Sequence, residues 1–170
     1  MKTKLMTLAA AMGILMARTA TAAEADPTKH YSTDKRWTFE LQDGWNEVEI
    51  DQEGIRQFTK ERDGMVVGVS QCHQIDADGA GLTETVDSYV EQIKEQGWRV
   101  TERGDSKVGE TKALRMKLSG YNDAGVKVIV EERWVLRNGT ITVFRFFAMD
   151  GYQETLKGDS EGFFKSIELK

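Results

Sequence analysis

The sequence contains a single cysteine, Cys72, and a single proline, Pro27. One cysteine cannot form a disulfide within the chain, so packing alone must hold the fold together. A lone cysteine acts more often as a small buried hydrophobic side chain than as a reactive or intermolecular thiol, and we favour that interpretation for Cys72.

The chain also lacks an excess of basic residues. It has 23 Lys and Arg residues against 28 Asp and Glu residues, for a net charge of -5. Removal of the first 22 residues, which include Lys2, Lys4 and Arg18, leaves 20 basic residues and a net charge of -8. Nucleic acids and anionic membrane surfaces both require a basic footprint, so neither is expected as a partner.

No apolar run reaches the roughly 20 residues of a membrane-spanning helix. The longest, Leu5 to Ala17, covers 13 residues and follows a basic start. Small residues at Ala20 and Ala22 then predict a signal peptide over residues 1–22, cleaved after Ala22 or Ala23. We therefore expect a periplasmic or secreted protein with no membrane span in the mature chain. Residues 23–32 are predicted to form a flexible leader, and residues 33–170 a single domain.

Motifs of cofactor binding and catalysis are absent as well. There is no glycine-rich nucleotide loop and no glycine-flanked nucleophile, so no cofactor is expected. The only histidines are His30, in the predicted leader, and His73. His73 adjoins Cys72 in a strand pattern, where neighbouring side chains point to opposite faces. A hydrolase that uses His73 or a carboxylate pair remains an alternative.

Three Asp-Gly or Asn-Gly pairs, at 43–44, 63–64 and 138–139, lie between stretches of alternating apolar residues. Such pairs favour two-residue hairpin turns because both turn residues need a positive φ. A two-residue turn also sets which residues face each other. The predicted facing pairs are Phe39 with Val48 and Trp37 with Ile50 at the first turn; Phe58 with Val69 and Lys60 with Val67 at the second; and Trp134 with Val143, Val130 with Phe147 and Val128 with Met149 at the third.

One segment has the helical period. Its apolar residues are Leu82, Val86, Tyr89, Val90 and Ile93. We expect Thr83 to cap the start of this helix and Gly97 to end it. Further strands are predicted at 98–101 and 113–118, a second helix around 152–165, and a last strand at 167–169. Strands that occur in runs predict an α+β fold, with a central antiparallel sheet of about six strands flanked by helices.

In this order of elements the chain resembles the PsbP-like fold family over roughly residues 33–169. The resemblance is carried by the opening 37–41 strand with its Gly44-Trp45 turn, the 82–93 helix, the 109–113 segment before the 114–118 strand, the 135–148 hairpin and the closing 163–167 segment. It implies an α/β/α sandwich and a non-enzymatic role in binding a protein partner. The chain departs from the family at Asp43, where a proline commonly precedes the Gly-Trp turn, and it has no lipid-bearing cysteine near the leader.

The predicted hairpin at 138–139 places Glu132 opposite Arg145, on an otherwise apolar face. Opposite charges that face each other across two strands stabilise the pairing, so we favour a structural ion pair over a polar spot on a binding face. Both residues stay candidates for binding. Trp45, directly after a turn, is the tryptophan expected to be partly exposed and to contribute to an interface.

The segment from Asp76 to Asp87 follows a calcium-binding loop in part. Acidic residues occupy positions 1, 3, 9 and 12 (Asp76, Asp78, Glu84 and Asp87), and a glycine occupies position 6. Position 5 is Ala80, however, and no helix precedes the loop. Calcium takes six or more oxygen ligands, so we favour a solvated turn over a metal site.

Together these features favour an exported, non-enzymatic binding or accessory protein of the cell envelope, which recognises a protein partner or a small apolar ligand. A structural subunit of an envelope assembly is the other alternative to the hydrolase.

Overall fold

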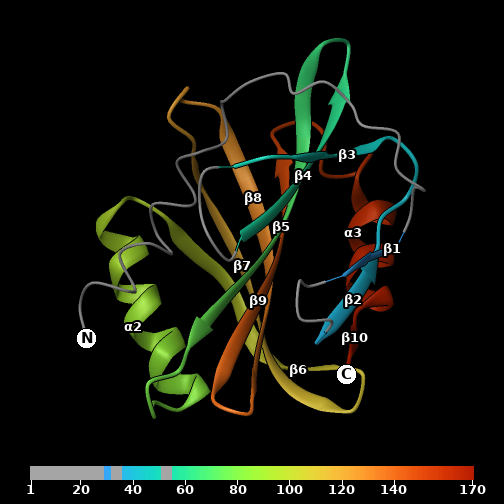
Figure 1. Cartoon of the computed structure of the whole chain (residues 1–170). Coiled ribbons are helices and arrows are strands. Elements are labelled where there is room, and N and C mark those ends of the chain that lie inside the picture. Colours follow the sequence, from blue (N-terminus) through green and yellow to red (C-terminus); the bar gives the residue numbers. More distant parts are fainter. Residues whose placement is uncertain (1–28, 32–35, 51–54) are drawn as a thin grey trace.

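Seven antiparallel strands form the main sheet of the computed structural model, which describes residues 29–31, 36–50 and 55–170 (Figure 1). In spatial order they are β3 (Trp45–Val48), β4 (Ile55–Arg62), β5 (Met65–Asp76), β9 (Thr140–Met149), β8 (Lys127–Arg137), β7 (Thr111–Tyr121) and β6 (Arg99–Val108). A smaller sheet has the order β1 (Lys29–Tyr31), β2 (Trp37–Glu40) and β10 (Glu168–Leu169). The described residues also form the helices α2 (Leu82–Glu95) and α3 (Lys157–Ser166).

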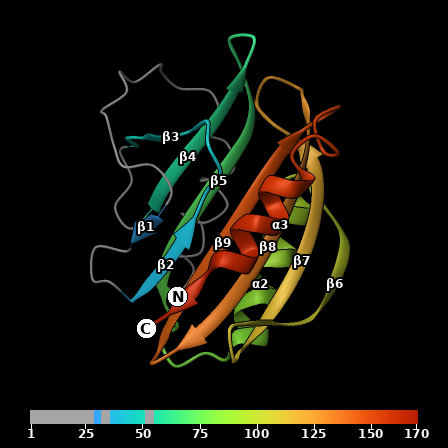
Figure 2. The same cartoon turned by 90° about the vertical axis from the view of Figure 1, so that its right-hand side faces the viewer.

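The main sheet is the middle of three layers. Helix α2 lies on one face, and α3 with strand β2 of the small sheet lies on the other (Figure 2). Apolar side chains fill both interfaces. The α2-side core includes Val86, Tyr89, Ile93, Met116, Val130, Trp134 and Phe147, and the α3-side core includes Trp37, Phe39, Phe58, Cys72, Phe144, Phe146 and Phe163. The predicted α+β class is confirmed, with seven strands in the main sheet where about six were expected.

The third predicted hairpin is confirmed. Asn138 and Gly139 have φ values of 51° and 75°, as a two-residue hairpin turn requires. The register pairs Trp134 with Val143 and continues to Val130 with Phe147 and Val128 with Met149, all as predicted. Strand β9 is buried on both faces, so this turn sets the register of the two strands at the centre of the molecule.

The second hairpin has the predicted turn but a different register. Asp63 and Gly64 both have positive φ, and Glu61 pairs with Val66 as a two-residue turn requires. A β-bulge between Lys60 and Glu61 then shifts the pairing by one residue. Beyond the bulge, Lys60 pairs with Gly68 and Phe58 with Ser70, so the predicted pairs of Lys60 with Val67 and Phe58 with Val69 are wrong.

The first predicted hairpin does not form. Gly44 has a positive φ of 87°, but the strands on its two sides belong to different sheets. Phe39 pairs with His30 and Trp37 with Leu169, so the predicted partners Val48 and Ile50 are wrong. The cause is long-range packing, because the rings of Trp37 and Phe39 contact Phe144 and Phe163 of the α3-side core.

Helix α2 buries the predicted stripe, with Val86, Tyr89 and Ile93 fully enclosed. Its N-cap is Gly81 rather than Thr83, and no side chain caps the first turn. The cap prediction fails because the helix begins at Leu82, which places Thr83 inside the first turn. Gly97, with a φ of 86°, follows the end of the helix as expected.

The small sheet joins strands from both ends of the described chain, β1 and β2 near its start and β10 at its end. Strand β1 lies within the segment predicted as a flexible leader, and it pairs with β2. His30 of β1 is half-buried, and its ring centroid lies 4.2 Å from that of Phe58. The predicted signal peptide and its cleavage site lie outside the described residues. Among the residues that are described, no helix is both long and apolar enough to cross a bilayer.

Candidate functional site

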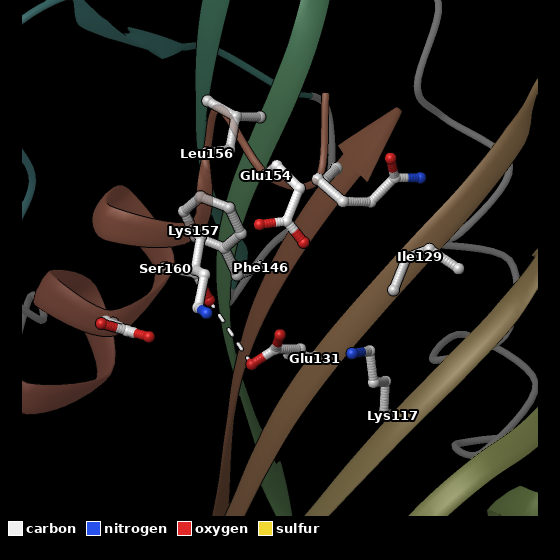
Figure 3. Close-up of a pocket in the computed structure, with 11 residues that line it drawn as sticks. Lys117, Ile129, Glu131, Phe146, Glu154, Leu156, Lys157 and Ser160 are labelled. Atoms are coloured by element: carbon white, nitrogen blue, oxygen red, sulfur yellow. Dashed lines mark hydrogen bonds between the residues drawn. The ribbon is translucent and has the colours of Figure 1, made fainter. Parts of the chain in front are cut away.

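A cavity of about 380 Å³ lies between the main sheet and the segment that leads into α3 (Figure 3). We call it the α3 groove. Its floor is apolar and consists of Ile129 from β8, Phe146 and Ala148 from β9, and Leu156 from the segment before α3. Since Ile129 and Ala148 face each other across β8 and β9, the sheet itself forms a continuous apolar base.

Charged side chains of both signs surround this floor. Figure 3 shows Lys117 and Glu131 from the sheet facing Glu154 and Lys157 from the α3 side. Lys117 and Glu131 are opposite each other in the register of β7 and β8. The Ser160 hydroxyl lies 3.5 Å from a Glu131 carboxylate oxygen. An apolar floor with a charged rim is suited to binding, because the floor supplies buried area and the rim supplies orientation.

Helix α3 is fixed beside the groove by one buried carboxylate. An oxygen of Asp159 accepts hydrogen bonds from the Trp45 indole at 3.1 Å and the Lys60 ammonium at 2.7 Å. Trp45 is only 9% exposed, so the predicted exposure of this tryptophan is wrong. The sheet makes room for its ring at Gly68, where an added Cβ would lie 3.0 Å from the indole. Trp45 therefore anchors α3 and is almost entirely buried.

Glu132 and Arg145 face each other as predicted, and both are completely buried in the α2-side core. The Arg145 Nε donates to Glu132 at 2.6 Å, and Glu132 also accepts from the Tyr89 hydroxyl at 3.0 Å and the Trp134 indole at 2.7 Å. Burial would lower the pKa of Arg145, but Tyr89 and Glu132 outweigh it and raise that pKa above its usual value. Arg145 therefore stays charged inside the core.

His73 lies in the last third of β5 and is 5% exposed. Burial, with a smaller effect of Arg145, lowers the pKa of its imidazole to about 3. Ser70 and Cys72, the nearby candidate nucleophiles, alternate with His73 along the strand and so point to the opposite face. Burial also raises the pKa of the Cys72 thiol. Cys72 is 1% exposed, which confirms the interpretation of a small buried hydrophobe.

The partial calcium loop does not gather its acids. Asp78 and Gly79 form a turn with positive φ between β5 and α2, while Asp87 pairs with Arg103 at 2.7 Å. Over residues 29–31, 36–50 and 55–170, no three His, Cys, Asp or Glu side chains come together in a way that could hold a metal ion. Asp76 ends β5, Asp78 lies in the turn and Asp87 lies within α2, so the three acids belong to three different elements.

Sequence reasoning missed the α3 groove. The alternation along 113–118 and 128–136 indicates that Lys117 and Glu131 share a face. No pattern in the sequence indicates that Glu154 and Lys157 lie across from them, because the position of α3 depends on long-range contacts such as that of Trp45 with Asp159.

The architecture is similar to that of several solved proteins of low sequence identity. CyanoP, the cyanobacterial PsbP of Synechocystis sp. PCC 6803, has a TM-score of 0.61 at 10% identity, over 91% of this chain and 99% of that chain. The Ran-binding protein Mog1p of Saccharomyces cerevisiae has a TM-score of 0.59 at 11% identity, over 86% of this chain and 96% of that chain. This chain has the PsbP-like fold. LpqN of Mycobacterium tuberculosis, described as involved in cell envelope biogenesis, shares the fold with a TM-score of 0.59 at 15% identity, over 84% of this chain and 90% of that chain.

The resemblance to the PsbP-like fold is thus confirmed at the level of architecture. A longer protein from Bacteroides thetaiotaomicron also matches, with a TM-score of 0.56, and the chain spans 49% of its length. No protein-family model and no curated protein sequence matches the chain. At identities of 10–15% the PsbP-like fold carries no function with it, so function has to be argued from the groove.

Proposed function

We propose that this protein is an exported, non-enzymatic binding protein of the cell envelope that holds a segment of a protein partner in the α3 groove. The observation that carries the proposal is the apolar floor of Ile129, Phe146 and Ala148 inside a rim of both charges. A volume of about 380 Å³ lies within the range of roughly 300–1,000 Å³ that is usual for binding sites.

The composition of the groove favours binding over catalysis. Its only hydroxyl is that of Ser160, which lies near Glu131, and its titratable groups are carboxylates and lysines. His73, the residue considered for a hydrolase, lies on the opposite face of the sheet, and the candidate nucleophiles Ser70 and Cys72 point away from that face. A hydrolase that pairs His73 with Ser70 or Cys72 therefore has no geometric support.

The charges of the rim suggest what a partner segment carries. Glu154 and Glu161 offer carboxylates on the α3 side, and Lys157 lies between them in sequence. A segment with apolar side chains flanked by at least one basic residue complements this arrangement, since opposite charges across an interface set orientation. Export is supported by the signal-peptide pattern of the first 22 residues. The names of two proteins with the same fold, a Ran-binding protein and a protein involved in cell envelope biogenesis, are compatible with a binding role.

Site-specific photocrosslinking in the native envelope tests this proposal. A photoreactive amino acid is placed at Glu154 or Glu161 on the rim, and at Glu110, a fully exposed residue in the turn between β6 and β7, as the matched control. We expect one defined protein to be crosslinked from both rim positions but not from Glu110. Ile129→Trp, which fills the floor, should abolish the crosslink, while Lys112→Trp on exposed surface should not.

Two results would contradict the proposal. One is the same crosslinked proteins from Glu110 as from the rim. The other is a rim crosslink that survives Ile129→Trp in a variant whose circular dichroism shows a folded chain. Once the partner segment is known, calorimetry with a synthetic peptide should show at least about tenfold weaker binding to Glu154→Lys, equivalent to about 1.4 kcal/mol.

A further inference from the structure

A second set of buried polar side chains crosses the opposite face of the sheet. Gln57 of β4, Gln71 of β5 and Arg145 of β9 are neighbours in register, and His73 lies two residues along from Gln71. Arg145 is fully buried, Gln71 is 2% exposed and His73 is 5% exposed. We call this set the Gln71–Arg145 cluster. In the described part of the chain, α2 packs mainly on β8 and β6, so the cluster lies beside the helix.

The hydrogen bonds within the cluster leave specific atoms unpartnered. Gln71 donates from Nε2 to Gln57 at 2.6 Å, and Arg145 donates from Nε to Glu132 at 2.6 Å. Within the described ranges, both terminal nitrogens of Arg145, Oε1 of Gln71 and Nδ1 of His73 have no hydrogen-bond partner. Native proteins rarely leave buried polar atoms in this state, because each costs about 1–3 kcal/mol. The two Arg145 nitrogens are donors, the Gln71 oxygen is an acceptor, and the His73 nitrogen is either one according to its tautomer. Together they indicate a bound group that can both accept and donate.

The charges of the cluster further restrict the kind of group that it can bind. The guanidinium of Arg145 is already neutralised by the carboxylate of Glu132, and the imidazole of His73 is uncharged near neutral pH. A bound anion would leave one buried negative charge without compensation, which is costly in a protein interior. A neutral group with a carbonyl oxygen and an N–H adds no charge and satisfies both kinds of unpartnered atom.

We propose that the Gln71–Arg145 cluster is a second binding site, which recognises the amide group of a ligand. The ligand carbonyl accepts hydrogen bonds from the terminal nitrogens of Arg145, and the ligand N–H donates to Oε1 of Gln71. The ring of Tyr89 lies 5.5 Å from the Arg145 guanidinium carbon, so α2 borders the site. The site is independent of the α3 groove, since the sheet separates the two.

Nuclear magnetic resonance of the ¹⁵N-labelled full chain tests this inference. The Arg145 Nε–H and the Trp134 indole N–H are built-in reporters, because both donate to Glu132. The probes are N-methylacetamide, which represents a peptide bond; acetamide, which represents a primary carboxamide; and acetate, an anion of similar size. At least one amide should shift both reporter signals in a saturable way, and the stronger of the two amides identifies the kind of ligand. Acetate should leave the signals in place.

A matched pair of variants assigns the effect to the cluster. Gln71→Met removes the acceptor and should weaken amide binding about tenfold, which corresponds to the loss of one buried hydrogen bond. Gln74→Met alters a half-buried glutamine on the opposite face of the same strand and should leave the affinity unchanged.

Three results would overturn the inference. The first is acetate binding as tight as that of the amides, which would make the cluster an anion site. The second is no shift with any probe, which would leave ordered water as the partner of these atoms. The third is equal affinities for Gln71→Met and Gln74→Met. If Gln71→Met does not fold, the comparison of amides with acetate on the unsubstituted chain still decides.

Discussion

Replacement of the buried ion pair, one partner at a time and then together, offers the most direct test of how the α2-side core is stabilised. In Arg145→Met, Glu132 keeps the hydrogen bonds from Tyr89 and Trp134 but loses its counter-charge. A buried pair broken on one side costs about 3–5 kcal/mol, and we expect this variant to fall near the lower end. Glu132→Met should fall near the upper end, since it leaves the guanidinium without any carboxylate and also removes the acceptor of two other donors.

The double variant Glu132→Met/Arg145→Met should be more stable than either single variant. It removes both charges and leaves two neutral donors without their former acceptor, at a combined cost of about 2 kcal/mol relative to the original chain. The free energy of unfolding is measured by urea denaturation, followed by tryptophan fluorescence and far-ultraviolet circular dichroism. Arg115→Met, on exposed surface, is the control and should change stability by less than about 0.5 kcal/mol. A double variant as unstable as the sum of the two single variants would refute this account of the pair, as would a loss below about 1 kcal/mol for Arg145→Met.

Three further predictions concern packing, pH and reactivity. Gly120→Ala places a Cβ 2.4 Å from the Trp98 ring and should lower the free energy of unfolding by about 1–3 kcal/mol. Gly158→Ala, whose added Cβ meets open space in α3, should raise the free energy of unfolding slightly. Thermal melts that rank the two variants in the opposite order would contradict this. His73 has a folded pKa of about 3 against 6.5 when unfolded, so its contribution to stability is complete above pH 6.5 and is lost as the pH falls towards 3. Between pH 7 and pH 5 this amounts to about 2 kcal/mol, and urea titrations of the original chain should show it while those of His73→Gln should not. Cys72 should resist iodoacetamide at pH 8 in the folded chain and react on unfolding, as followed by mass spectrometry; rapid labelling of the folded chain would argue against its burial.

Local features of the sequence predicted the parts of the fold that depend on local physics. The Asn138-Gly139 turn needs only two residues with positive φ, so its register, and with it the Glu132 and Arg145 pair, could be derived from residue counting. The stripe on α2 follows in the same way from the helical period.

The candidate site was less accessible to such reasoning. Glu132 and Arg145 were found because a single turn relates them. The α3 groove was not found, since it joins β8 and β9 to a segment that reaches them only through the fold. Trp45 shows that local reasoning does not reveal long-range contacts. Its position directly after a turn indicated exposure, but its indole donates a hydrogen bond to Asp159, more than a hundred residues later, and is buried.

By itself, then, the sequence determined the fold class, the central hairpin and the face that α2 buries, because turn conformation and side-chain periodicity act over a few residues. Only the tertiary structure decided that β2 belongs to the small sheet while β3, the next strand in sequence, belongs to the main sheet. It also decided that a bulge shifts the register of β4 on β5, and that α3 lies beside the groove. In each case the chain could adopt another strand pairing or helix position with a similar local conformation. The arrangement that forms is the one that buries side chains distant in sequence against one another. No short stretch of sequence contains both of the residues that come into contact.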